Sequence, residues 1–316
     1  MSHLSASEGL RIAVLLPCRN DAPTIDGVVR GFRENLPEAR VYVFDEASTD
    51  DTARIAAKAG AKVLRGAVPG KGTALWRMFA DIDADIYLMA SGDGACEPAD
   101  ASSLVNALLT ERLDMVIGTS ARLGGAKIEG SSWSGGGFGE AYRRLFGAGF
   151  SDPFAERASP YRALTRRLVK SFPPVAPSLS PETALTLHAS ELGIPVASLS
   201  LDGGREAPRQ TAERSAGRFG GEMATLLRIM LEARPLALFG TLAAAFGILG
   251  LVIALPLILA ALAGSAAGAS ATVIAVGTFL LAAFLLATGF VLESLRRARL
   301  EQKRILFLSV PALAVQ

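Results

Sequence analysis

Short apolar runs alternate with longer stretches of helical spacing through the first two-thirds of the chain. The apolar runs predict buried strands, and they lie at 12–16, 41–44, 62–64, 86–90, 115–118 and 196–201. The helical stretches lie at 24–35, 51–59, 72–79, 99–110, 161–172 and 181–192. This regular alternation predicts an α/β domain with a mostly parallel sheet and helices on both faces.

Two uncharged apolar stretches, 236–263 and 271–292, follow this pattern. Each exceeds the roughly 20 residues that a membrane-spanning helix needs, and the short turn between them carries no charge. Basic residues flank the pair: Arg214, Arg218, Arg228 and Arg234 before it, and Arg296, Arg297, Arg299, Lys303 and Arg304 after it. The pattern predicts a two-helix transmembrane hairpin with both flanks in the cytoplasm. The alternative is a hairpin buried in a soluble core, which is less favoured because soluble domains rarely bury two such long uncharged segments.

The predicted organisation is a cytoplasmic domain (1–204), a basic juxtamembrane segment (205–234), the two transmembrane helices (235–293) and a basic cytoplasmic tail (294–316). Apolar residues at helical spacing in 217–233 indicate a helix that lies either on the bilayer surface or against the domain. The first nine residues are polar and lack the apolar core of a signal peptide. The net charge of +2 indicates no particular class of partner. We expect no nucleic-acid partner.

Polar clusters follow three of the predicted strands, at 17–21, 45–51 and 91–97. In parallel sheets ligands bind beyond the carboxyl ends of the strands, so these side chains should converge at one edge. Asp45, Glu46 and Asp93 suit a nucleotide-diphosphate site, because one carboxylate can accept hydrogen bonds from a base or ribose and another can bind a divalent cation. Each cluster alone is also compatible with ordinary turns and helix caps.

The order and spacing of four motifs are more specific. They are Leu-Leu-Pro-Cys-Arg-Asn-Asp (15–21), Phe-Asp-Glu-Ala-Ser-Thr-Asp-Asp-Thr (44–52), Gly-Lys-Gly (70–72) and Ser-Gly-Asp-Gly-Ala-Cys-Glu-Pro (91–98). This series resembles the family-2 glycosyltransferases of the GT-A fold, nearest to the bacterial polyprenyl-phosphate sugar transferases related to dolichyl-phosphate mannose and glucose synthases. The resemblance continues through 159–167, 181–188, 234–240 and 301–304, and thus covers nearly the whole chain.

The resemblance implies roles for individual residues. On the donor side, the nucleotide sugar would be bound by Pro17, Asn20, Asp21, Asp45, Glu46, Lys71, Ser91 and Asp93. Asp93 would also bind the metal, Mg²⁺ or Mn²⁺. On the acceptor side, Arg162 and Glu182 would lie near the acceptor, with Asp152 or Glu156 supplying a further catalytic carboxylate. Arg205 and Arg209 precede the membrane and are placed to hold the acceptor phosphate.

Three positions depart from the family pattern. Ser91 stands where the first Asp of the Asp-x-Asp motif is expected, Pro160 replaces a Gly, and Ala184 replaces a Glu. Losing one carboxylate weakens a cation site without necessarily abolishing it, because water and diphosphate oxygens still coordinate.

Two functions therefore remain. The first is metal-assisted, inverting transfer of a sugar from a UDP- or GDP-sugar to polyprenyl phosphate, at the cytoplasmic face of the bacterial inner membrane, as part of cell-envelope synthesis. The second is an inactive family member that serves as a membrane scaffold or nucleotide-binding regulator. The sequence decides neither the sugar, the nucleotide and the lipid nor whether the chain forms a homo-oligomer.

Overall fold

The structure is a computed structural model that describes residues 9–66, 71–119, 159–173, 180–201, 235–263 and 269–313. It divides into two compact units. The sheet unit contains residues 1–217 and 303–316, and the helical unit contains residues 218–302. Each unit is described separately below.

The sheet unit is built on one seven-stranded sheet with the order β3-β2-β1-β4-β6-β5-β7. The strands are β1 (Ile12–Cys18), β2 (Arg40–Asp45), β3 (Lys62–Arg65), β4 (Ile86–Met89), β5 (Met115–Thr119), β6 (Arg162–Thr165) and β7 (Val196–Ser200). β1 pairs in parallel with β2 and β4, and β5 pairs in parallel with β7. β6 is antiparallel to both of its neighbours, β4 and β5. The predicted α/β sheet is thus confirmed, with one antiparallel strand.

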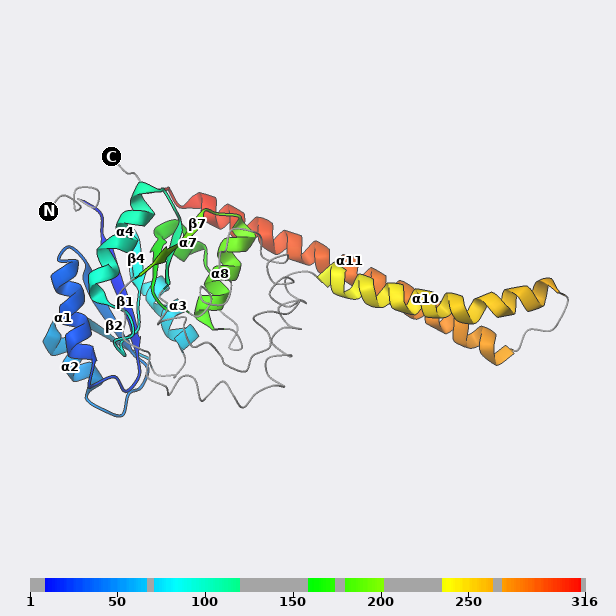
Figure 1. The fold of residues 1–316 in the computed structure, drawn as a ribbon, viewed down its shortest axis with the longest axis horizontal. Coiled ribbons are helices and arrows are strands. Elements are labelled where there is room, and N and C mark those ends of the chain that lie inside the picture. Colours follow the sequence, from blue (N-terminus) through cyan, green and yellow to red (C-terminus); the bar gives the residue numbers. More distant parts are fainter. Residues whose placement is uncertain are drawn as a thin grey trace. The chain divides into compact units, whose positions relative to one another are not determined.

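Helices cover both faces of this sheet (Figure 1). They are α1 (Ile25–Asn35), α2 (Thr52–Ala59), α3 (Lys71–Asp81), α4 (Ala101–Thr110, after the short 3₁₀ turn Pro98–Asp100), α7 (Arg166–Ser171) and α8 (Pro181–Leu192). Side chains of a strand alternate between its faces, so each strand serves two cores. In β1, Val14 and Leu16 pack with α1, α2 and α4, whereas Ala13 and Leu15 pack with α3, α7 and α8.

One prediction was wrong. Residues 161–172 were expected to form a single helix, but the segment forms strand β6 and then the short helix α7. Every side chain of β6 is buried, and Ala163 and Leu164 point into opposite cores, as the period of two in a strand requires. The ladder with β4 and β5 supplies the backbone partners that a helix would otherwise give. The other helices and strands of the sheet unit lie within two residues of their predicted ends.

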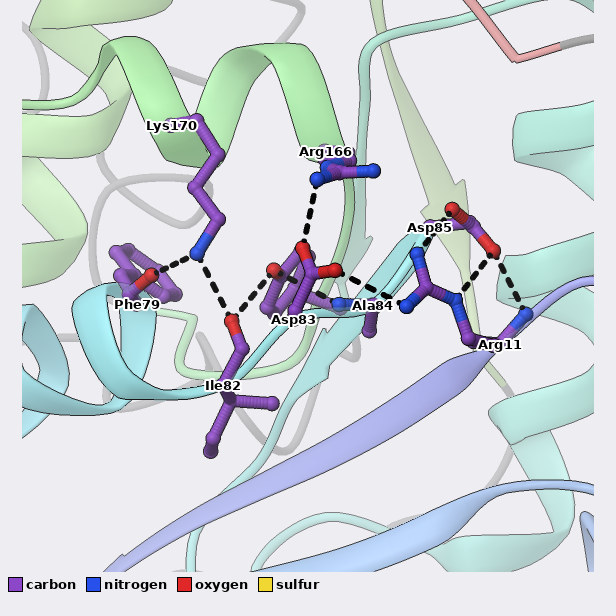
Figure 2. Close-up of polar contacts among 9 residues, drawn as sticks. Arg11, Phe79, Ile82, Asp83, Ala84, Asp85, Arg166 and Lys170 are labelled. Atoms are coloured by element: carbon purple, nitrogen blue, oxygen red, sulfur yellow. Dashed lines mark hydrogen bonds and ion pairs between the residues drawn. The ribbon is translucent and has the colours of Figure 1, made fainter.

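Ion pairs connect neighbouring elements at the edge of the sheet where β1 and β4 begin (Figure 2). Asp83 bridges Arg11 of the β1 entry at 3.0 Å and Arg166 of α7 at 2.8 Å. The backbone N–H of Arg11 also donates to Asp85 Oδ2 at 2.9 Å. Lys170 of α7 donates to two backbone carbonyls at and just beyond the end of α3, at 2.6 and 2.9 Å. These contacts fix α7 and the α3–β4 connection, and they leave the opposite edge of the sheet for the polar motifs.

The helical unit contains two long apolar helices, α10 (Pro235–Leu262) and most of α11 (Ala269–Ser309). Both are long and apolar enough to cross a membrane, and their most apolar windows are only 11% and 17% buried. This exposure disfavours the alternative of a hairpin buried in a soluble core. The turn was predicted at 264–270; residues 264–268 lie outside the described residues, and residues 269 and 270 begin α11. Helix α11 also continues past the predicted end at 292 to Ser309.

Glycines mark where α10 and α11 pack together within this unit. A Cβ added to Gly250 would lie 3.3 Å from the Phe279 ring, and one added to Gly289 would lie 3.0 Å from Phe239 Cβ. Residue 250 of α10 thus faces residue 279 of α11, whereas the earlier residue 239 of α10 faces the later residue 289 of α11. The two helices therefore run antiparallel, as a hairpin requires. Small residues at such crossings allow the close helix approach on which packing in lipid depends.

Candidate active site at the carboxyl edge of the sheet

The loops that follow β1 and β2 are joined into one surface by hydrogen bonds. The backbone N–H of Asn20 donates to Ser48 Oγ at 3.0 Å, and the backbone N–H of Thr49 donates to Asn20 Oδ1 at 2.9 Å. The backbone N–H of Asp21 donates to Thr52 Oγ1 at 2.9 Å. Asn20 has a φ of 60°, a left-handed conformation that Asn tolerates better than most residues. The predicted nucleotide loop is therefore held against the next motif by side chains from both.

The loop after β4 closes onto the same edge. Thr24 Oγ1 donates to the carbonyl of Gly92 at 2.8 Å, which fastens this loop to the start of α1. Gly92 approaches so closely that an added Cβ would lie 2.3 Å from Cys18 Sγ and 3.1 Å from Asp21 Oδ2. Beside it, Asp93 Oδ1 accepts a hydrogen bond from the backbone N–H of Ala95 at 3.0 Å. Only a residue without a side chain fits at position 92, and this brings Asp93 to the ends of β1 and β2.

Four carboxylates gather around the buried Cys18 thiol. Burial raises the pKa of Cys18 well above its usual value, and the negative charges of Asp21, Asp45, Glu46 and Asp93 raise this pKa further. Asp45 and Glu46 are themselves buried, with 7% and 3% of their surface exposed. The thiol therefore stays protonated at neutral pH and is a poor nucleophile. The carboxylates form a negative site that suits hydrogen-bond donors or a cation.

A small cavity of about 20 Å³ lies next to these motifs. It is lined by Pro17, Leu75, Met89, Ala90, Ser91, Pro160, Pro181 and Glu182. Ser91 follows β4, and Glu182 lies in the first turn of α8. The cavity thus brings the altered Asp-x-Asp position beside a residue predicted to lie near the acceptor.

Arg162 is fully buried behind α8 instead of lining this cavity. Its Nε donates to the carbonyl of Ser159 at 3.0 Å, and its Nη1 donates to Thr186 Oγ1 at 2.8 Å. The Thr186 hydroxyl in turn donates to the backbone carbonyl of Glu182 at 3.0 Å. Arg162 therefore lies one helical turn from Glu182 and supports α8 from within the core.

Comparisons with known proteins agree on a family. Residues 13–140 match the model for glycosyl transferase family 2. Protein RfbJ of Shigella flexneri is 47% identical over 107 residues, which cover 34% of this chain and 83% of that protein. Glycosyltransferase AglJ of Haloferax volcanii is 32% identical over 186 residues, 58% of this chain and 59% of that one. The chain belongs to glycosyltransferase family 2.

A solved structure supports the same conclusion for this glycosyltransferase. Glucosyl-3-phosphoglycerate synthase from Mycobacterium tuberculosis, in complex with Mn²⁺, uridine diphosphate and phosphoglyceric acid, is similar with a TM-score of 0.53 and 26% identity. A second structure of the same enzyme, in complex with phosphoglyceric acid alone, is similar with a TM-score of 0.54. That match covers 67% of this chain and 77% of the other. The GT-A-like fold predicted from the motifs is confirmed.

The described residues of this glycosyltransferase can bind a metal ion only if the substrate supplies further ligands. Among the described residues there is no group of three His, Cys, Asp or Glu side chains that could hold a metal. Asp93, half-buried at the carboxyl edge, can supply one carboxylate. Mg²⁺-type ions are commonly bound through one or two carboxylates together with substrate phosphates and water, so a single Asp suffices for an ion that arrives with its substrate.

Several predicted site residues lie outside the part of the chain that the structure describes. Asp152, Glu156, Arg205 and Arg209 fall outside the described residues. Lys71 begins α3, but its side chain also falls outside them. Their roles stay predictions.

Sequence reasoning did not single out the hydroxyls that hold the glycosyltransferase site together. Ser48, Thr49 and Thr52 lie within a recognised motif, and Thr24 lies just beyond another, yet only the carboxylates were given roles. A usable signal was present, since Ser and Thr directly after a strand commonly bond to neighbouring backbone and side chains.

Proposed function

We propose that this glycosyltransferase transfers a sugar from a UDP- or GDP-sugar to polyprenyl phosphate at the cytoplasmic face of a bacterial membrane. The observation that carries the proposal is the convergence of Asp21, Asp45, Glu46 and Asp93 at one sheet edge, next to the cavity that contains Ser91 and Glu182. Ligands of open α/β sheets bind beyond the carboxyl ends of the strands, which is where these carboxylates lie.

The donor side follows from the chemistry of these carboxylates. Asp45 and Glu46 are acceptors for hydrogen bonds from a base imide or from ribose hydroxyls. A divalent cation held by Asp93 would neutralise the diphosphate as it leaves. The solved complexes of the Mycobacterium tuberculosis synthase with Mn²⁺ and UDP-glucose support this donor class.

The acceptor side rests on the two apolar helices. The synthase was crystallised with phosphoglyceric acid, a soluble phosphorylated acid. This chain has two helices apolar enough to span a membrane, which favours a phosphate carried on a lipid. A phosphate monoester has its second pKa near about 6, so it is largely dianionic at neutral pH and needs no strong general base. Arg205 and Arg209 are proposed to hold it at the membrane interface.

A transfer assay on the full chain in detergent tests the proposal. Radiolabelled UDP- and GDP-sugars are offered with polyprenyl phosphate, and phosphoglycerate serves as the soluble comparison acceptor. We expect metal-dependent label in the lipid fraction with one donor. Transfer only to phosphoglycerate would refute the lipid acceptor. Donor binding with neither transfer nor hydrolysis would favour the inactive regulator that the Ser91 substitution suggests.

The metal role is tested separately by calorimetry. Asp93→Ala should abolish the Mn²⁺-dependent part of nucleotide-sugar binding, while Ser91→Asp should strengthen it, because each change removes or adds one anionic ligand. Asp81→Ala, an exposed carboxylate at the far end of α3, is the matched control and should leave binding unchanged. Unchanged metal-dependent binding in the Asp93 variant would contradict the assignment.

A further inference from the structure

Residues 303–313, here called the C-terminal segment, belong with the sheet unit and pack into it. Lys303 Nζ lies 2.6 Å from Glu191 Oε2 of α8, and the two side chains are only 26% and 16% exposed. Four residues later, Phe307 is 9% exposed and is part of the core formed with α3, α7 and α8. A spacing of four places Lys303 and Phe307 on one helical face.

The remaining side chains show that this contact is one-sided. Ile305, Leu306 and Leu308 are 67%, 53% and 79% exposed, so Phe307 is the large apolar side chain that this turn buries. The guanidinium of Arg167 from α7 lies 4.8 Å from the centre of the Phe307 ring, within the range of a cation–π contact. Arg167 is itself held by the fully buried Asp114, with Nη2 to Oδ2 at 2.6 Å. Phe307 thus occupies a specific packing site formed by α7 and α8.

Helix α8 connects the Phe307 packing site with the candidate active site. Its last turn contributes Glu191, and its Leu185 and Ala189 belong to the same core as Phe307. Its first turn contributes Glu182 to the cavity that contains Ser91. The twelve residues of α8 span about 18 Å as a single rigid helix. A contact that fixes one end of such a helix also restricts the position of the other.

We propose that the C-terminal segment is a positioning element of the active site: through Lys303 and Phe307 it holds α8 so that Glu182 stays beside Ser91. The role of the cavity in this statement rests on the proposed transfer activity. Neither Lys303 nor Phe307 touches the substrate in this arrangement, and both act through α8.

The experiment uses the full chain in detergent and compares Phe307→Ala with Leu308→Ala. Leu308 is adjacent on the same helix but exposed, so its truncation is the matched control. Phe307→Leu, which keeps an apolar side chain, is the conservative rescue. Hydrogen exchange of residues 181–192 reports the hold on α8, exchange of β1 reports the fold, and transfer assays give kcat and the donor KM.

In Phe307→Ala we expect amide exchange in α8 to rise at least tenfold, with β1 unchanged. We expect kcat to fall about tenfold while the donor KM stays within twofold, because the donor carboxylates lie on other elements. Leu308→Ala should match the wild type, and Phe307→Leu should recover most of the loss. Lys303→Glu and Glu191→Lys should each lower kcat, and the double charge exchange should restore it.

Three results would overturn the proposal. Equal α8 exchange in Phe307→Ala and Leu308→Ala would mean that the segment does not hold the helix. Faster exchange with unchanged kcat would mean that it holds α8 without positioning the site. Parallel loss of donor binding and β1 protection would mean that Phe307 stabilises the whole sheet unit and does not position α8 in particular. If the wild type transfers no sugar at all, the proposed function fails. Amide exchange still tests the hold on α8 in that case: faster exchange at Thr183 and Ala184, whose N–H groups bond to Ser180, in Phe307→Ala but not in Leu308→Ala supports it, and unchanged exchange refutes it.

Discussion

His188 should make the sheet unit less stable as the pH falls below neutrality. It lies in α8 with 2% of its surface exposed, its Nε2 is 3.0 Å from Ser171 Oγ, and its ring packs edge-on against Phe172. Its buried Nδ1 has no hydrogen-bond partner among the described residues. Burial, and secondarily the charge of Lys303, lower the pKa of His188 from 6.5 to about 3.

The sign and size of this pH dependence of the unfolding free energy follow from proton linkage. Between the two pKa values an unfolded chain binds a proton at this position and the folded chain does not, so lowering the pH favours unfolding. The free energy of unfolding should therefore fall by about 1.4 kcal/mol per pH unit below pH 6.5, which amounts to about 2 kcal/mol at pH 5. Above pH 7 the contribution of this histidine should be constant.

The assay is urea unfolding of the full chain in detergent, followed by tryptophan fluorescence at several pH values from 7.5 to 5. His188→Gln is the informative variant, because Gln can still bond to Ser171 but does not titrate. Other titrating groups are common to both proteins, so the difference between the two unfolding free energies isolates His188. That difference should shift by about 2 kcal/mol in favour of the variant between pH 7.5 and pH 5. Parallel curves for the two proteins would refute the reasoning.

Three further predictions concern other parts of the chain. Asp114→Ala should cost about 2–4 kcal/mol in urea unfolding, less than a fully buried pair would, because Arg167 keeps some access to water. Gly92→Ala should cost about 1–3 kcal/mol by overpacking against Cys18, and adding Cys18→Ala should recover most of it; equal loss in both variants would contradict the close approach. Reporters fused at Gly268, outside the described residues, and at the C-terminus should face opposite sides of the membrane, and the same side for both would exclude the hairpin.

The fold was largely predictable from the sequence because the strands β1, β2, β4 and β5 contain continuous apolar runs and most helices have a clear period. The segment 161–172 was not, since a four-residue buried strand followed directly by a helix has no period long enough to recognise. The convergence of Asp45, Glu46 and Asp93 followed from their places after parallel strands. The burial of Arg162 did not follow, because its partner Thr186 is provided by another element, α8.

The distribution of the sheet unit over two stretches of chain has a practical consequence. Removing everything after residue 217 is the obvious way to obtain a soluble fragment, yet it would also delete Phe307 from the core and Lys303 from its contact with Glu191. Loss of a buried Phe side chain alone typically costs about 3–5 kcal/mol, a large part of the stability of a single domain. In topological terms the hairpin is an insertion within the enzyme, and a soluble version should be made by excising residues 218–302 and joining the two flanks with a flexible linker.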